Sequence, residues 1–124
     1  MKAILCKSFG EPENLILEEV QDLKPKKEEV LVEVHSASLN FPDTLQIAGK
    51  YQYQPPFPFI PGSEAGGIII GLGQNVKGFT IGDRVMANPG IGAMAEQLCV
   101  CFDFLQLLFA CLVAVLKRFF LIVR

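Results

Sequence analysis

Short apolar runs separated by glycine and proline fill the first hundred residues of the chain. Residues 30–34 alternate strictly, with the three valines on one face and Leu31 and Glu33 on the other, which predicts a strand with one buried face. The three isoleucines at 68–70 predict a strand that is buried on both faces. The predicted strands lie at residues 2–6, 15–20, 30–34, 68–70, 85–87 and 94–100. Many short strands between turn signals favour a β-sandwich or an open barrel.

One short helix is predicted within this β-rich region, over residues 41–48. Asn40 is a favourable N-cap, and Pro42 is tolerated in a first helical turn. Asp43 places a negative charge near the positive end of the helix dipole. A helix start therefore accounts for the spacing of Asn40 and Asp43 without any further function.

Composition and charge narrow the functional classes. The chain has 124 residues, and 51% of them are hydrophobic, which excludes a disordered protein. A formal net charge of −2 and the lack of a basic stripe give no reason to expect a nucleic-acid partner. Four cysteines occur without an apolar leader at the N-terminus, so we expect a reducing, cytoplasmic location rather than a disulfide scaffold.

The last fifth of the sequence has a different character. No glycine or proline follows Gly92, and residues 104–116 carry no charge. This pattern predicts an apolar helix over residues 102–123. The uncharged run of 13 residues gives about 20 Å of helix, against about 30 Å for a bilayer core. A membrane span is therefore not expected unless Lys117 and Arg118 snorkel to one interface.

Five motifs in the middle of the chain carry a resemblance to a known family. They are LNFPD at 39–43, GKY at 49–51, PPFPFIPGSEAGG at 55–67, GLGQNV at 71–76 and GFTIGDRV at 78–85. In this order and spacing they resemble the N-terminal GroES-like domain of medium-chain dehydrogenases/reductases. The zinc-free quinone oxidoreductase (zeta-crystallin-like) branch is the best match. The resemblance covers roughly residues 1–100.

The resemblance implies a mainly β fold, a partly open GroES-like barrel with short helices. We divide the chain into a GroES-like domain at residues 1–100 and an apolar tail at 101–124 that is not family-like. Relatives complete their barrel with chain that returns after a Rossmann domain, so we expect this barrel to be incomplete. The 24 residues after Val100 are fewer than the roughly 30 that one βαβ unit needs.

The same tail leaves several alternatives open. One is a truncated or frame-shifted product, whose apolar end packs on the exposed barrel or drives self-association. Another is a membrane anchor, and a third is a continuation that follows the family in a form the motifs do not reveal.

Zinc is not expected in this chain. In the zinc alcohol dehydrogenases of the superfamily, a Cys stands three residues before the Asp of the first motif, and a His stands between the Gly and the Glu of the third. Asn40 and Ser63 occupy those positions here. Two of three expected protein ligands are thus missing, while catalytic zinc needs three. The single histidine, His35, shares a strand face with Glu33 and is expected to lie at the surface.

The resemblance also implies the chemistry of the complete enzyme. Relatives bind NADPH between this domain and the Rossmann domain and pass hydride to quinones or to other activated alkenes and carbonyls. Asn40 and Tyr51 match residues that line the nicotinamide cleft, so both are candidate catalytic residues. Asn40, Asp43 and Tyr51 are the candidate cofactor-binding residues, with Asp43 expected to fix the loop rather than transfer protons. Leu45 stands where many relatives carry another tyrosine, which leaves the substrate open.

Structural roles compete with these functional ones. Tyr51 and Tyr53 would also serve to cover an edge of the core, and Glu64 would serve to bond strand-end amides. The run from Gly90 to Ala95 fits the spacing G-x-G-x-x-A of a dinucleotide fingerprint. That fingerprint must open a helix, whereas a strand is predicted here, so we expect no phosphate loop.

Two classes of function follow. In the first, the chain is the catalytic-side domain of an NADPH-dependent quinone or enone oxidoreductase, truncated before the Rossmann domain and inactive alone. In the second, it is a non-catalytic interaction or membrane-associating fragment.

Overall fold

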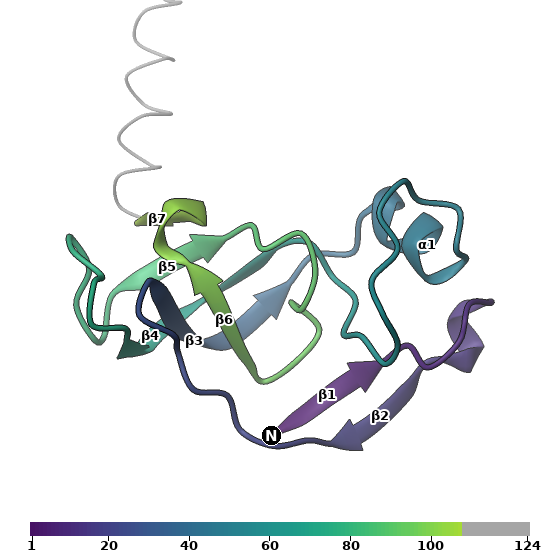
Figure 1. Cartoon of the computed structure of the whole chain (residues 1–124), viewed down its shortest axis with the longest axis horizontal. Coiled ribbons are helices and arrows are strands. Elements are labelled where there is room, and N and C mark those ends of the chain that lie inside the picture. The colour runs from purple at the N-terminus through teal and green to yellow at the C-terminus, as the bar shows by residue number, and fades with distance from the viewer. Residues whose placement is uncertain (108–124) are drawn as a thin grey trace, which may run out of the picture.

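Seven strands, one α-helix and two 3-10 turns make up the described part of the chain (Figure 1). The structure is a computed structural model, and it describes residues 1–107. The strands are β1 (Lys2–Leu5), β2 (Ile16–Glu19), β3 (Glu29–Ala37), β4 (Ala65–Leu72), β5 (Arg84–Ala87), β6 (Gln97–Cys101) and β7 (Leu105–Leu107). The helix is α1 (Phe41–Ile47), and the turns are η1 (Pro12–Asn14) and η2 (Phe102–Phe104). Each of the six predicted strands overlaps one of β1 to β6, and α1 lies within the predicted helix.

The strands form two antiparallel sheets. Five of them pair in the order β6-β3-β4-β5-β7, and β1 pairs with β2. Isolated bridges from Ala3 to Ala95 and from Cys6 to Phe59 connect the small sheet to the rest of the chain. The mainly β, GroES-like architecture is thereby confirmed, and the sheets do not close into a barrel.

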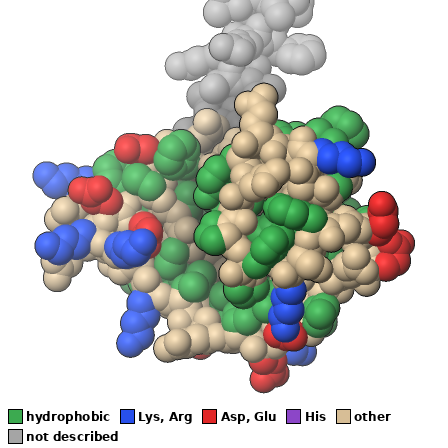
Figure 2. All heavy atoms as spheres, turned by 45° about the vertical axis from the view of Figure 1, so that its right-hand side comes forward, with side chains coloured by type: hydrophobic (Ala, Val, Ile, Leu, Met, Phe, Trp, Pro, Cys, Tyr) green, Lys and Arg blue, Asp and Glu red, His purple; other side chains and the backbone are tan. Residues whose placement is uncertain are grey.

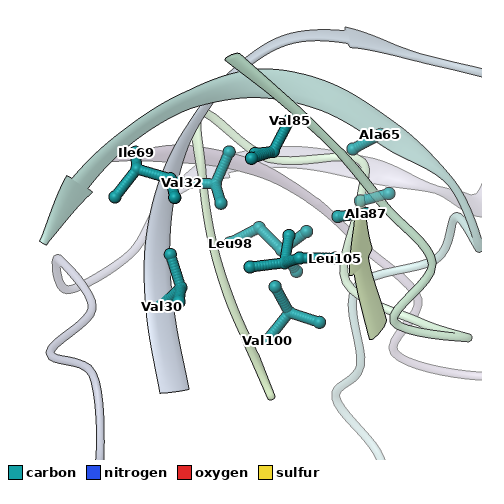
Figure 3. Packing of buried hydrophobic residues seen from close by; sticks show 10 residues of the cluster. Val30, Val32, Ala65, Ile69, Val85, Ala87, Leu98, Val100 and Leu105 are labelled. Atoms are coloured by element: carbon teal, nitrogen blue, oxygen red, sulfur yellow. The ribbon is translucent and has the colours of Figure 1, made fainter. Parts of the chain in front are cut away.

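Alternation along β3 and β4 builds the main core (Figure 3). Val30, Val32 and Ile69 are fully buried, and Glu33 and His35 on the opposite face of β3 are exposed. His35 Nε2 lies 3.1 Å from Glu33 Oε2, as expected for a surface pair. A smaller cluster of Cys6, Ile47 and Phe59 holds α1 against the end of the two-stranded sheet.

The isoleucine run at 68–70 is buried on one face only, which corrects the prediction. Ile69 points into the core, whereas Ile70 is 38% exposed. Met86 on β5, which pairs with Gly66 near the other end of β4, is also exposed. The reason is that no second layer of the described chain covers this part of the outer face of β4 and β5, so burial there follows the ordinary alternation of a strand.

The predicted apolar helix over residues 102–123 is wrong at its beginning. η2 is a single turn, and β7 pairs with β5 through Leu105 opposite Ala87 and Leu107 opposite Val85. Leu105 enters the core, because the free edge of β5 offers backbone partners that the local pattern does not reveal. The remainder of the predicted helix, residues 108–124, lies outside the described residues. Within residues 1–107, no helix is long and apolar enough to cross a bilayer.

At Gly67 the backbones of β3 and β4 approach each other closely. A Cβ atom at this position would lie 2.1 Å from the Glu33 carbonyl oxygen and 2.7 Å from Val32. The β3–β4 pairing shifts register between Val34 and Ser36 beside this contact. The two central strands therefore approach closely only because position 67 has no side chain.

Substituting Gly67 with alanine is expected to destabilise the protein by about 3 kcal/mol or more, because the new methyl group meets backbone that cannot move away. The matched control is Gly66→Ala, whose Cβ would meet the Ser36 hydroxyl at 3.0 Å, and a hydroxyl can rotate. Urea unfolding followed by circular dichroism measures both variants. Equal stability of the two would contradict the close approach at Gly67.

Candidate functional site

An open pocket of about 610 Å³ lies between α1 and three loops, and we call it the α1 pocket. The loops contribute residues 51–53, 63–64 and 88–91. Its lining consists of Asn40, Pro42, Asp43, Gln46, Tyr51, Tyr53, Ser63, Glu64, Asn88, Pro89, Gly90 and Ile91. The three residues singled out from the sequence, Asn40, Asp43 and Tyr51, all lie on its wall. Convergent polar side chains in a concave site are typical of a small-molecule pocket.

The β3–β4 pairing brings two distant loops to this pocket. Ala37 pairs with Ala65 at the end of the ladder, and the next contact is the Ser38 N–H donating to the Glu64 carbonyl oxygen at 3.2 Å. The chain that enters α1 and the chain that enters β4 therefore leave the sheet side by side. This contact places Asn40 next to Ser63 and Glu64, more than twenty residues away in sequence.

Asp43 fixes the start of α1. Its carboxylate accepts a hydrogen bond from the Asn40 backbone N–H at 2.8 Å, and its own N–H donates to the Asn40 carbonyl oxygen at 3.0 Å. The Asp43 side chain is 5% exposed. The reciprocal contacts hold Asn40 in place at the helix N-terminus.

The Asn40 side-chain amide is already engaged through its nitrogen. Nδ2 lies 3.1 Å from Glu64 Oε2, 3.1 Å from Ser38 Oγ and 3.4 Å from Ser63 Oγ. A carboxylate only accepts hydrogen bonds, so the amide nitrogen must face Glu64. The donor group of Asn40 is consequently used within the site, and Oδ1 is the acceptor atom of its side chain.

Glu64 forms the centre of this hydrogen-bond network. Its Oε2 accepts from Ser38 Oγ at 2.8 Å as well as from Asn40 Nδ2. The hydrogen bond from Ser38 first, and that from Asn40 second, lower the pKa of the Glu64 carboxyl. The carboxylate thus bonds side chains of the site rather than strand-end amides.

The two positions that carry zinc ligands in the zinc branch lie next to each other here. They are Asn40 and Ser63, and the Asn40 amide points at the Ser63 hydroxyl. An amide and a hydroxyl are poor replacements for thiolate and imidazole as zinc ligands. Across residues 1–107, no three His, Cys, Asp or Glu side chains converge as a metal site.

Two tyrosines line the pocket from the loop after α1. Tyr51 is 38% exposed and Tyr53 is 58% exposed, so both side chains are accessible at the pocket. Leu39 and Phe41 beside α1 are 83% and 75% exposed. Figure 2 shows hydrophobic side chains grouped on the face that includes the α1 side, with many charged side chains towards its margins.

Gln46 and Asn88 are pocket residues that the sequence analysis did not identify. The buried residues of α1 are Asp43, Gln46 and Ile47, which have the i, i+3, i+4 spacing of one helix face. Two of these three residues are polar, and a polar residue on the buried face of a helix could have marked Gln46 as a site candidate. Asn88 follows directly after β5, where a strand ends beside the pocket.

A second hollow of about 550 Å³ adjoins the α1 pocket along the outer face of the large sheet. It shares Glu64 and Asn88 with the α1 pocket and is otherwise lined mainly by small or apolar residues. These other residues are Ser36, Ala37, Ser38, Ala65, Gly66, Met86, Ala87, Phe104 and Gln106. The Glu64 network therefore separates two neighbouring open sites.

These features define a GroES-like β domain with a polar pocket beside helix α1. The chain belongs to the alcohol dehydrogenase GroES-like domain family, whose profile matches residues 26–109. Its named relatives include quinone oxidoreductases of the medium-chain dehydrogenase/reductase superfamily, as the motifs predicted.

Individual relatives match at moderate identity. Mouse quinone oxidoreductase-like protein 2 is 40% identical over 96 residues, which are 77% of this chain and 27% of the relative. Human quinone oxidoreductase is 37% identical over 98 residues, which are 77% of this chain and 30% of the relative. The chain spans between a quarter and a third of the length of such relatives.

Solved structures agree with this assignment. Escherichia coli quinone oxidoreductase in complex with NADPH matches with a TM-score of 0.83 and 31% identity, covering 87% of this chain and 33% of that one. The human synaptic vesicle membrane protein VAT-1 homolog-like protein matches with a TM-score of 0.83 and 36% identity, covering 86% and 34%.

We expect the Glu64 carboxyl to titrate below its usual pKa, and Ser38→Ala to raise that pKa by removing the stronger hydrogen bond. A carbon-detected NMR titration of the side-chain carboxyl measures both. Because the pKa is lowered, the network stabilises the fold at neutral pH and loses that contribution as the pH falls through the Glu64 pKa. Ser36→Ala is the control, and an equal shift in both variants would contradict the network.

Proposed function

We propose that this chain is the catalytic-side domain of an NADPH-dependent, zinc-independent oxidoreductase that acts on quinones or other activated alkenes and carbonyls. The observation that carries the proposal is the α1 pocket, in which Asn40, Asp43 and Tyr51 come together from two motifs of the family. The NADPH complex of a quinone oxidoreductase with the same fold supports the choice of cofactor. The proposed partner is a small molecule, and the proposed location is cytoplasmic.

Each pocket residue has a distinct task in this proposal. NADPH, when bound, supplies the hydride. Tyr51 donates its hydroxyl hydrogen to the substrate oxygen on which negative charge develops, which replaces the polarising effect of a metal. Asn40 offers Oδ1 to a donor group of the nicotinamide or the substrate, and Asp43 keeps Asn40 in position through the helix start. The same pocket wall thus orients both reactants.

The described residues offer little to the phosphates of a dinucleotide. Gly90 and Gly92 both have positive φ and lie in a loop that runs into β6, not into a helix. A phosphate site of the dinucleotide type uses the N-terminus of a helix. We therefore propose that these 124 residues alone do not turn over NADPH, and that the exposed apolar surface beside α1 packs against a nucleotide-binding domain in a working enzyme.

A chimaera tests the proposal directly. Residues 1–107 replace the matching N-terminal part of Escherichia coli quinone oxidoreductase, and NADPH oxidation with a quinone acceptor is followed by absorbance. We expect turnover by the chimaera and none by the 124-residue chain. A correctly folded chimaera that binds NADPH and reduces no quinone or enone would overturn the proposal.

Within the active chimaera, Tyr51→Phe is expected to lower kcat about 100-fold while leaving the melting temperature unchanged, because only a hydrogen-bond donor is lost. Tyr53→Phe, the other tyrosine of the same loop, is expected to stay close to the parent. Unchanged kinetics of the Tyr51 variant would remove this residue from the catalytic machinery. Tight, saturable NADPH fluorescence with the 124-residue chain would contradict the absence of a cofactor site in it.

A further inference from the structure

Gln46 carries an unpartnered polar atom at the α1 pocket. The side chain is 4% exposed and lines the pocket from α1. Its Oε1 atom is shielded from solvent and has no hydrogen-bond partner within residues 1–107. A buried acceptor that neither protein nor water satisfies is costly, and such groups mark places where a partner is expected.

The neighbours of Gln46 explain why the fold does not satisfy this atom. Asp43, one helical turn earlier, is an acceptor and is occupied by the Asn40 backbone N–H. The Asn40 amide nitrogen, a donor on the same pocket, is directed at Glu64 and Ser38. The Asn40 donor is thus used to build the site, and the Gln46 amide oxygen has no partner among the described residues.

We propose that Gln46 is a specificity-determining residue that selects ligands bearing a hydroxyl or N–H donor at the ring edge entering the α1 pocket. A small movement of the Gln46 side chain, which already lines the pocket, brings Oε1 within reach of a donor on the ligand. Tyr51 then donates to a carbonyl of the ligand, while Gln46 accepts from its hydroxyl group. This inference rests on the proposed function. It narrows the substrate class to hydroxyl-bearing quinones and related phenolic rings.

Discrimination of this kind has a physical basis. A site that hydrogen-bonds a substrate hydroxyl rejects the analogue without it, because the buried acceptor is then left unpaired. An apolar residue at position 46 would remove that penalty for both ligands. The donor-bearing ligand would consequently lose its advantage, although the size of the pocket would change little.

Two small aromatic probes of similar shape test the inference on the full 124-residue chain. 4-Methoxyphenol has one hydroxyl donor, and 1,4-dimethoxybenzene has none; neither adds to thiols as quinones do. Titration of the isotope-labelled chain is followed by NMR through the backbone amides of the pocket and the side-chain amide of Gln46. We expect the phenol to bind about tenfold more tightly than the ether and to shift the Gln46 side-chain resonances.

Gln46→Met is the matching variant, because methionine has a similar length and shape and forms helices well. In this variant the ratio of the two dissociation constants, ether over phenol, is expected to fall to about one. The control Gln74→Leu, in the exposed turn after β4, is expected to retain the ratio of the parent chain. A preference that survives in a folded Gln46→Met chain, or equal binding of the probes to the parent without a shift of the Gln46 side chain, would overturn the inference. If neither probe shifts any pocket resonance, the failure lies with the pocket as a ligand site and hence with the proposed function as well.

Discussion

The antiparallel pairing of β3 with β4 is the constraint on which the rest of the structure depends. It supplies the fully buried centre of the core through Val30, Val32 and Ile69, and it holds the middle of the five-stranded sheet. Ala37 and Ala65 form its last pair, and beyond them the two chain segments continue side by side as loops at the same end of the sheet. The pairing holds these two loops together at that point, and the pocket lies between them and α1.

The chemistry of the site follows from the same geometry. The loop before α1 and the loop before β4 meet through Ser38, Asn40 and Glu64, and their hydrogen bonds orient the Asn40 amide. At the two positions that carry zinc ligands in the zinc branch, Asn40 and Ser63 lie within the same hydrogen-bonded network. In the proposed function, the polar groups left for a ligand are Asn40 Oδ1, the Tyr51 hydroxyl and the Gln46 amide oxygen.

Local patterns predicted much of this fold, and long-range pairing explains the rest. The alternation at 30–34 and the N-cap at Asn40 are local signals, and both elements occur where they were predicted. β7 was missed because its strand character comes from the free edge of β5, which no local pattern encodes. In the same way, the family motifs pointed to Asn40, Asp43 and Tyr51, whereas the direction of the Asn40 amide depends on Glu64, 24 residues away. The boundary drawn at residue 100 and the roles of the site residues stay predictions.

The register at the end of the β3–β4 ladder is the central claim, and proton–proton contacts in solution measure it most directly. Nuclear Overhauser spectra of the isotope-labelled chain should show Ala37 facing Ala65, followed by a contact between the Ser38 amide and Glu64. Ala37 facing any residue other than Ala65 would move Glu64 away from Asn40 and contradict this account of the pocket.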